Sequence, residues 1–419
     1  MFLTTMRALR NRNYRLFFTG NGLSLVGTWM QTVTVGWLVY RLSHSSYILG
    51  VTGALGTLPV LLFSIFGGYV ADKISRYKII LFTQFFAMIQ AFLLALLTLS
   101  GNIKVAHIMV LSFILGTINA FDLPARQSFI VNIVEKKEDL PNAISLNSFL
   151  VNGARLVGPS IAGILVASFG EGICFLLNAV SYIAVISALL MMDVQKIKPI
   201  VDSDNKGKVF EKLHEGFKYV IGFVPVRTVI LYVAFFSTFG MFYGVLMPVF
   251  AKDVFMGTAR TLGFLVGSGG FGAIIGAIYL ASRRKHAGLG KIIHLAGIVF
   301  GLCIILFSYC SVLWFAVIIL AIVGATMVLQ IVTGNIVLQT LVSDEKRGRT
   351  MSFHTLAFMG TQPVGAYLAG FLGKHIGIQN TVLLSGILCI AGSIVFRMKY
   401  LSFASKDNEN DTVKKVFIG

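Results

Sequence analysis

Charged residues are scarce in this sequence of 419 residues. Asp, Glu, Lys and Arg together supply 12% of it, against about 25% in a typical soluble domain. Hydrophobic residues supply 56%. A soluble fold of this length could not bury so much apolar surface, because its own surface has to be largely polar. The composition therefore argues against a soluble globular protein and indicates a chain whose surface faces lipid.

Acidic residues are the rarer charged kind, with 17 Asp and Glu against 35 Lys and Arg, which gives a formal net charge of +18. On a soluble protein this balance would suggest a nucleic-acid partner. Here the basic residues lie between apolar segments, so membrane topology explains them better. We expect no nucleic-acid partner.

The sequence also lacks the familiar signatures of catalysis and of metal binding. A G-x-x-x-x-G-K-[ST] loop, an H-E-x-x-H motif and a nucleophile elbow are all missing. The four cysteines lie inside apolar segments without metal-type spacing, so we interpret them as packing residues. We therefore expect neither an enzyme nor an ATP-driven pump, and no cofactor or metal. The N-terminus lacks a small-residue cleavage site, so it is not expected to be a cleavable signal.

Twelve apolar segments are long enough to cross the hydrocarbon core, which takes about 20 residues of helix. The sequence predicts an all-α polytopic membrane protein with two pseudo-symmetric six-helix halves, residues 1–192 and 226–400. A cytoplasmic linker, 193–225, joins them, and a polar tail, 401–419, follows. The predicted helices are 14–40, 48–71, 79–99, 105–121, 143–167, 173–192, 228–250, 262–281, 292–309, 313–338, 351–372 and 381–396.

The distribution of basic residues supports this arrangement. If the N-terminus is cytoplasmic, 29 of the 35 Lys and Arg residues fall on the cytoplasmic side and five on the other, and Arg155 lies within a helix. Such an excess is the positive-inside signal of membrane proteins. We therefore expect both termini in the cytoplasm. Within the linker, one apolar face predicts an amphipathic helix at the membrane surface, formed by Phe210, Leu213, Phe217 and Val220.

The loop after the second helix reads GYVADKISRYK from Gly68. It resembles the signature of the major facilitator superfamily, G-x-x-x-D-[RK]-x-G-[RK]-[RK]. The resemblance implies that Asp72 helps to latch the cytoplasmic side shut. The alternative is a helix cap among positive-inside charges. The matching residues are Gly68, Asp72, Lys73 and Arg76.

The two halves also resemble each other weakly, since AISLNS from Ala143 aligns with TMSFHT from Thr350 and Pro159 aligns with Pro363. Parallel six-helix repeats are typical of transporters that hold substrate between the halves.

The fifth helix contains GARLVGPSIAG, which resembles the antiporter-associated motif of the same superfamily and so favours export. Small residues would let another backbone approach closely, and a proline would permit a bend. The residues concerned are Gly153, Gly158, Pro159, Ala162 and Gly163.

Arg155 lies in the same helix, twelve residues from its predicted start and so about 18 Å along it. A central arginine costs about 2.5–3.5 kcal/mol on insertion scales, so it should face a cavity or a partner rather than lipid. Every Asp and Glu is expected in a loop or near a helix end. An anionic substrate could therefore supply the partner. The alternative is that Arg155 braces helices through carbonyl or amide groups.

Two stripes of small or polar residues mark the first and tenth helices, which line the cavity in the superfamily. Each residue could instead bond a neighbouring helix. The first stripe is Gly20, Ser24, Thr28 and Gln31, with Trp29 beside it, and the second is Thr326, Gln330 and Thr333, followed by Asn335 and Gln339.

The fourth helix is predicted to end with Asn119, Asp122 and Arg126 on one face. Asp122 and Arg126 form an i,i+4 pair. Asp122 is a candidate for proton coupling, although an interfacial ion pair or gate is favoured. Proton-coupled drug exporters of the superfamily often carry an arginine inside this helix, and none is expected here. His294 and His354 lie near cytoplasmic helix ends, where packing roles are favoured over titration.

Longer stretches narrow the resemblance to the transmembrane-secretion branch of the superfamily, which includes enterobactin-type siderophore exporters. Examples are NAFDLPARQSFI from Asn119 and RGRTMSF from Arg347. The resemblance implies a secondary active exporter of the cytoplasmic (inner) membrane, working by alternating access. The expected substrate is a small anionic or oxygen-rich molecule such as a siderophore, exchanged for protons. A multidrug exporter is the alternative, and a lipid-handling or receptor-like membrane protein is one of a different class. The sequence leaves the oligomeric state open, with a monomer favoured.

Overall fold

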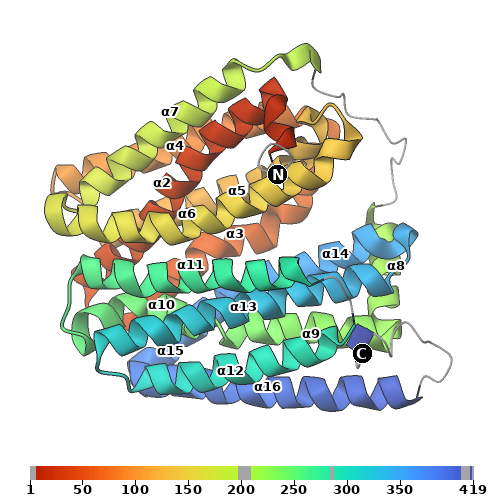
Figure 1. Ribbon diagram of the computed structural model, residues 1–419. Helices are drawn as coiled ribbons and strands as arrows, with labels where there is room; N and C mark the ends of the chain where they lie inside the picture. The colour runs from red at the N-terminus through yellow and green to blue at the C-terminus, as the bar shows by residue number, and fades with distance from the viewer. Residues whose placement is uncertain (1–5, 197–208, 284–286, 407–415, 418–419) are drawn as a thin grey trace. The chain divides into compact units, whose positions relative to one another are not determined.

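The computed structural model describes residues 6–196, 209–283, 287–406 and 416–417, and throughout these ranges the regular structure is helical (Figure 1). The first six long helices are α2 (Arg12–Ser43), α3 (Ser46–Lys73), α4 (Arg76–Leu99), α5 (Val105–Ile133), α6 (Leu140–Phe169) and α7 (Glu171–Leu190). The later ones are α8 (Val209–Gly222), α9 (Val224–Phe239), α10 (Phe242–Val249), α11 (Ala259–Ser282), α12 (Leu289–Ser308), α13 (Leu313–Leu341), α14 (Asp344–Met359), α15 (Gln362–His375) and α16 (Ile378–Lys406). This confirms the predicted all-helical class.

Ten helical segments of the described residues are long and apolar enough to cross a membrane. The two predicted crossings that are not among them are α2 and the α14–α15 pair. Helix α2 has 32 residues and carries arginines in its first and last turns. The membrane-protein class is therefore confirmed, while the count of twelve stays a prediction.

The chain divides into two compact units, Met1–Ser203 with Ala251–Gly267, and Asp204–Phe250 with Ser268–Gly419. Each is described by itself below. The predicted domain boundaries at residues 192 and 226 stay predictions. The linker prediction falls partly on residues 197–208, which lie outside the described residues. Its predicted amphipathic segment is helical in α8, where Val220 is buried and Phe217 is exposed.

The fourth predicted helix was placed too short. Its predicted end at residue 121 is wrong, because α5 continues to Ile133. The charged Asp122 and Arg126 look like a loop in the sequence, but inside the bundle they bond each other and their neighbours, so the helix does not have to stop. Arg126 therefore does lie inside this helix, contrary to the prediction that it carries no arginine.

Two predicted helices are interrupted. The predicted helix 228–250 is α9 and α10 with a break at Gly240, followed by a π-helical turn at Phe250–Val254. The predicted helix 351–372 is α14 and α15, which are separated at Gly360 and Thr361. Pro363 lies in the first turn of α15, where its missing N–H costs nothing.

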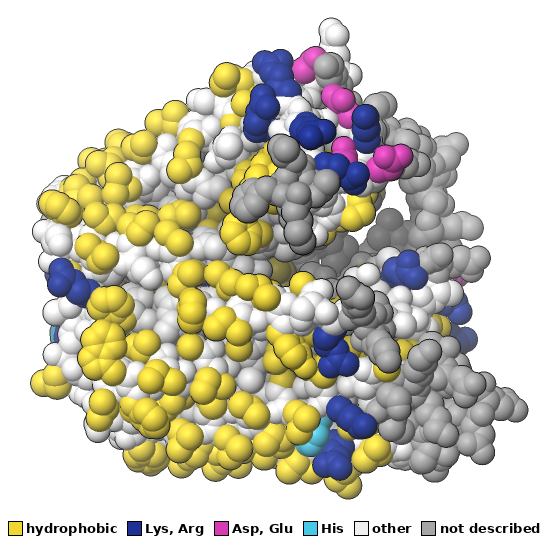
Figure 2. Space-filling view, viewed as in Figure 1, with side chains coloured by type: hydrophobic (Ala, Val, Ile, Leu, Met, Phe, Trp, Pro, Cys, Tyr) yellow, Lys and Arg dark blue, Asp and Glu magenta, His cyan; other side chains and the backbone are white. Residues whose placement is uncertain are grey.

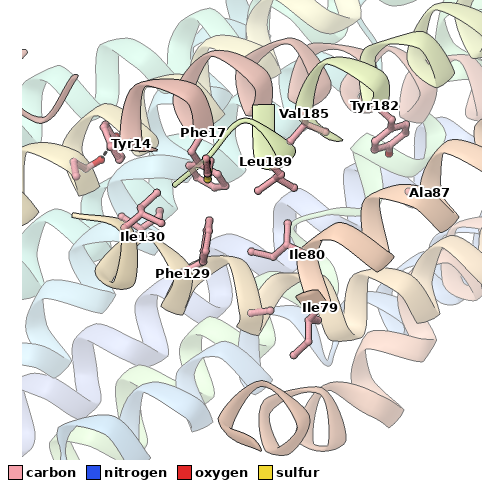
Figure 3. Close-up of a cluster of buried hydrophobic side chains, with 14 of the residues drawn as sticks. Tyr14, Phe17, Ile79, Ile80, Ala87, Phe129, Ile130, Tyr182, Val185 and Leu189 are labelled. Carbon is pink, nitrogen blue, oxygen red and sulfur yellow. Dashed lines mark hydrogen bonds between the residues drawn. The ribbon is translucent and has the colours of Figure 1, made fainter. Parts of the chain in front are cut away.

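A cluster of interlocking apolar side chains holds α2, α4, α5 and α7 together (Figure 3). Phe17 and Phe129 meet edge to face at 5.6 Å, and Figure 3 shows Ile80, Val185 and Leu189 beside them. Their burial removes apolar area from contact with the surroundings and fixes the four helices against one another. By fixing these helices, the cluster also fixes the positions of the polar residues that they carry.

The flanks of the helices expose large apolar side chains, as a lipid-facing surface requires. Phe82, Phe149 and Trp314 are each more than 60% exposed. Figure 2 shows hydrophobic side chains spread along the helix flanks, whereas Lys and Arg gather near helix ends. This distribution suits a protein that lies across a bilayer.

Candidate functional site

The predicted cavity residues Arg155 and Trp29 meet on neighbouring helices of the first unit. The guanidinium carbon of Arg155, on α6, lies 5.5 Å from the centroid of the Trp29 ring, on α2. Both side chains are half-buried. A cation over an indole face is attracted by the ring quadrupole. The pair presents positive charge and aromatic surface together.

Small residues on α6 let two other helices approach it closely, α2 at Gly158 and the start of α11 at Gly163. A Cβ added at Gly158 would lie 2.6 Å from the Trp29 Cβ and 2.9 Å from the Val26 carbonyl oxygen. At Gly163 it would lie 2.9 Å from both the Ala259 carbonyl oxygen and the Gly263 Cα. Close approach is thus confirmed at Gly158 and Gly163. At Gly153 the prediction is wrong, because nothing lies within 4 Å of an added Cβ.

Pro159 and Ala162 of the same motif are buried inside α6, which stays one helix from Leu140 to Phe169. The motif therefore forms a packing face on a continuous helix.

The polar stripe of α2 divides into bonded and half-buried members. Gln31 is 2% exposed and donates to the Gln90 amide oxygen at 3.0 Å, while its own oxygen accepts from Asn178 at 2.8 Å. Ser24 is also buried. These contacts favour the bracing alternative for Gln31, because its amide is used by α4 and α7. Thr28 is half-buried and bonds the Ser24 carbonyl.

A second polar network surrounds Asp122 and Arg126. The Arg126 Nε donates to the Asp122 carboxylate at 2.8 Å, and its Nη1 donates to the Asn21 side-chain oxygen. The same carboxylate accepts from the Thr83 hydroxyl at 2.6 Å and from the Gln84 amide at 3.0 Å. Asp122 is 5% exposed. The pair is therefore an internal junction of α2, α4 and α5.

The depth of this network can be estimated from the positions of its residues along three helices. Asp122 lies eleven residues before the end of α5, Asn21 nine residues after the start of α2 and Thr83 seven residues after the start of α4. At 1.5 Å per residue these positions are about 16, 13 and 10 Å from the helix ends. Sequence reasoning missed Asn21, Thr83 and Gln84, although their polarity inside apolar segments was a usable signal. Asn119, one turn before Asp122, is half-buried.

The predicted latch loop is described in part. The Lys73 ammonium lies 4.5 Å from the Tyr69 ring centroid, and the Arg76 Nη1 donates to the Asn132 side chain at 2.5 Å. Gly68 has open space around it. The Asp72 side chain lies outside the described atoms. The loop thus connects the start of α4 to the end of α5 through Arg76.

In the second unit the α13 stripe is mostly internal. Gln330 is 2% exposed, accepts from the Tyr232 hydroxyl at 2.6 Å and donates to the Thr326 carbonyl at 3.2 Å. Thr333 is fully buried. Asn335 accepts from Gln339 one turn away. Asn335 is half-buried and Gln339 is exposed.

The two histidines of the second unit differ. His294 is buried and its Nδ1 lies 2.9 Å from the Ser393 carbonyl oxygen. His354 is 5% exposed, and its Nε2 has no hydrogen-bond partner among the described residues. Both were predicted near helix ends, yet α14 begins at Asp344, so His354 lies about 15 Å along it.

No group of three or more His, Cys, Asp or Glu side chains within the described ranges could hold a metal ion.

Residues 3–415 match the family described as transmembrane secretion effector. The chain is 24% identical to the staphyloferrin A transporter of Staphylococcus aureus over 386 residues, 91% of this chain and 95% of that protein. It is 23% identical to the multidrug efflux pump Tap of Mycolicibacterium fortuitum, over 92% of this chain and 95% of that protein. It is 24% identical to the enterobactin exporter EntS of Shigella boydii, over 86% and 85%.

Solved structures share the fold. A bacterial homolog of the human lysosomal transporter Spinster, inward-facing and unoccupied, has a TM-score of 0.71 at 16% identity, over 94% of this chain and 97% of that one. A POT family transporter in complex with a thioalcohol-conjugated peptide has a TM-score of 0.73 at 15% identity, over 95% and 97%.

Proposed function

The chain belongs to the transmembrane secretion effector family of the major facilitator superfamily, and from this membership we propose that it exports a small anionic, oxygen-rich molecule of the siderophore type. It is a transporter and not an enzyme. Its relatives include a staphyloferrin A transporter, an enterobactin exporter and a multidrug efflux pump, which supports export of a small molecule. In this proposal the protein exchanges the substrate for protons and works by alternating access between its two halves.

The single observation that supports an anionic substrate is the contact between Arg155 and Trp29. A carboxylate or catecholate accepts two parallel hydrogen bonds from a guanidinium, which a neutral drug does not match. The indole face beside it suits a planar or aromatic part of the same molecule. Two of the relatives are named as a staphyloferrin A transporter and an enterobactin exporter, which supports a substrate of the siderophore type.

We further propose that both termini are cytoplasmic and that the protein works as a monomer. The charge distribution motivates the orientation, since 29 of 35 basic residues fall on one side of the predicted topology. Entry of protons down their gradient would supply the energy for export, because the sequence offers no ATP-binding loop.

Uptake into inside-out vesicles tests the proposal, because export from a cell is accumulation in such a vesicle. The probes are labelled staphyloferrin A, labelled enterobactin and a labelled macrolide, each with and without an imposed pH gradient. We expect accumulation of one of the first two, collapsed by a protonophore. Empty vesicles and vesicles with Arg155→Gln protein are the controls. Accumulation of the macrolide alone would overturn the anionic proposal.

A multidrug exporter is the second candidate, and the similarity to the efflux pump Tap favours it specifically. A drug exporter would bind by apolar contact and would not depend on one guanidinium. The macrolide arm of the same experiment, repeated with Arg155→Gln, separates the two functions. Vesicles that accumulate none of the three probes would count against both of these substrate classes.

A further inference from the structure

The second unit contains two buried polar atoms for which the described residues offer no hydrogen-bond partner: the Nε2 of His354 on α14 and the Oγ1 of Thr333 on α13. His354 is 5% exposed and Thr333 is fully buried. Buried polar atoms are nearly always bonded, and one left unbonded costs about 1–3 kcal/mol. Among its described residues the first unit also has two such atoms, Asn21 Nδ2 and Gln84 Oε1. Of the four side chains, only the imidazole of His354 can gain or lose a proton in the physiological pH range.

The two residues lie at the same level of a helical hairpin. Helix α14 follows α13 after only Val342 and Ser343 and packs against it (Figure 1). Thr333 lies eight residues before the end of α13, and His354 lies ten residues after the start of α14. These separations are about 12 and 15 Å along the two axes. The hairpin therefore brings an imidazole and a hydroxyl to similar depth.

We propose that His354, together with the Thr333 hydroxyl, is the internal proton-binding site through which the proton gradient drives export. This inference rests on the proposed function, because it names the group that carries the proton. Histidine suits the task because its charge changes between about pH 5 and 8, the range in which a cell maintains its gradient.

The proton step needs only the imidazole and water. Nε2 takes up one proton from one side of the membrane, the ring becomes an imidazolium, and the same N–H proton is released to the other side. With its proton on Nδ1, the neutral ring can accept a hydrogen bond at Nε2 from a hydroxyl. The imidazolium can donate from Nε2 to the oxygen of a hydroxyl. Neither atom is bonded within the part of the chain that the structure describes, but a threonine hydroxyl brought to the ring can serve both states by rotating, whereas an acid or a lysine would favour one of them.

Of the described side chains on α14 and on the helices packed against it, His354 is the one histidine. Helix α13 carries no ionisable side chain between Leu313 and Leu341. Arg349, five residues before His354, is bound by Glu215 of α8 at 2.6 Å, and the Lys346 ammonium lies 4.5 Å from the Tyr219 ring. The described ionisable residues of α8, α9 and α14 besides His354 are Glu215, Lys218, Tyr219, Arg227, Tyr232, Lys346, Arg347 and Arg349.

The Asp122 carboxylate of the first unit is the other candidate, and the contacts disfavour it. A proton arriving there would have to replace the ion pair with Arg126 and the bonds from Thr83 and Gln84. His354 Nε2 has no such bond to break among the described residues.

The first test needs no substrate. Purified full-length protein with labelled histidine rings is titrated in detergent by NMR, and the His354 signal is assigned by its loss in His354→Gln. We expect this ring to gain a proton between about pH 5 and 8, and Thr333→Val, which removes the hydroxyl, to move its midpoint. A His354 ring that stays neutral throughout would overturn the proposal.

The second test measures coupling in proteoliposomes with staphyloferrin A as the probe. His354→Gln should lose accumulation driven by a pH gradient while it keeps exchange of labelled for unlabelled probe, which moves no net proton. His294→Gln is the matched control, since that buried ring is already bonded to the Ser393 carbonyl, and it should keep both activities. Gradient-driven accumulation by His354→Gln at the wild-type rate would refute the site. Absence of any flux in the wild type would count instead against the proposed substrate, and the titration would still decide the proton site.

Discussion

The guanidinium carbon of Arg155 on α6 lies 5.5 Å from the centroid of the Trp29 ring on α2. An arginine is thereby held against an aromatic face by neighbouring helices of one unit, which is an arrangement that a desolvated cation tolerates. Most other polar residues of α2 that the sequence marked for the cavity bond adjacent helices instead. Variants of Arg155 and Trp29 therefore give the most direct test of the chemistry of the substrate.

Replacing Arg155 distinguishes recognition from bracing. Arg155→Lys keeps the charge but loses the planar fork, so it should retain partial export of an anionic probe, whereas Arg155→Gln should retain very little. Trp29→Leu should weaken binding by about 0.5–2 kcal/mol, the worth of a cation–aromatic contact. Probe-induced shifts of the melting temperature in detergent and vesicle flux measure these effects.

Arg260→Gln, at an exposed arginine near the start of α11, is the matched control and should behave as the wild type. If Arg155 only braces helices, Lys and Gln variants should both melt lower, and the probe should protect all variants equally. A Gln variant that exports staphyloferrin A normally would move the assignment to multidrug efflux.

The latch loop gives a second prediction. Asp72→Asn should reduce flux while the protein remains in the membrane, because the superfamily signature implies a carboxylate that closes the cytoplasmic side. Arg76→Gln should act in the same direction, since it weakens the contact with Asn132 that ties α4 to α5. Flux per molecule of protein, quantified by immunoblot of the membranes, is the measurement. Lys78→Gln, at an exposed position two residues on, is the control. Normal flux in Asp72→Asn would show that Asp72 acts only as a helix cap.

The Asp122–Arg126 pair should behave as a structural junction. Removing one partner of a buried ion pair leaves the other charge uncompensated, which costs about 3–5 kcal/mol. Asp122→Asn and Arg126→Gln should therefore each lower the melting temperature strongly, and the double variant should lose less than their sum. Thermal unfolding in detergent of the four proteins gives the coupling energy. Gln127→Ala, at the exposed neighbouring position, should be close to neutral. Additive losses would show that the two charges act independently.

The fold class was predictable because a membrane-spanning helix can be recognised from its length and apolar composition alone. The prediction of helix ends failed where charged residues lie inside a helix. Asp122 and Arg126 appeared to end their helix at residue 121, but Thr83, Gln84 and Asn21 from other helices satisfy them. A sequence shows that a charged residue is costly and does not show which distant residues offset that cost.

The candidate site was predictable only in part, for a related reason. The spacing of Ser24, Thr28 and Gln31 correctly placed them on one stripe of α2, yet spacing cannot tell a cavity from a neighbouring amide such as Gln90. Glycines gave the same ambiguity, since Gly153 and Gly158 are equal in the sequence and only Gly158 touches another helix. For His354 the sequence favoured packing over titration, and it became a candidate because its buried Nε2 is unbonded among the described residues.

The orientation of the chain is open to direct labelling. The four cysteines are buried in the structure, so a background without them should fold and give little signal. Single cysteines at Ser45 and Ser203 would then be probed with an impermeant thiol reagent on intact cells. We expect labelling at Ser45 and none at Ser203 until the cells are opened, because basic residues crowd the predicted cytoplasmic side. Labelling of Ser203 from outside would reverse the topology and, with it, the predicted location of the latch.

Two glycines of one motif provide an internally controlled test of how α2 and α6 pack. A Cβ added at Gly158 would lie 2.6 Å from the Trp29 Cβ, closer than real Cβ contacts come, whereas at Gly153 it would meet nothing within 4 Å. Gly158→Ala should therefore destabilise the protein by about 1–3 kcal/mol, as overpacking does. Gly153→Ala should be neutral or stabilise it by up to about 1 kcal/mol, the helix propensity difference between the two residues. Thermal unfolding in detergent measures both, and flux of the anionic probe should fall only in Gly158→Ala, because the displaced backbone of α2 carries Trp29 away from Arg155. If Gly158→Ala melts with the wild type and loses no flux, then α2 and α6 are not pressed together here and the Arg155–Trp29 surface does not depend on their contact.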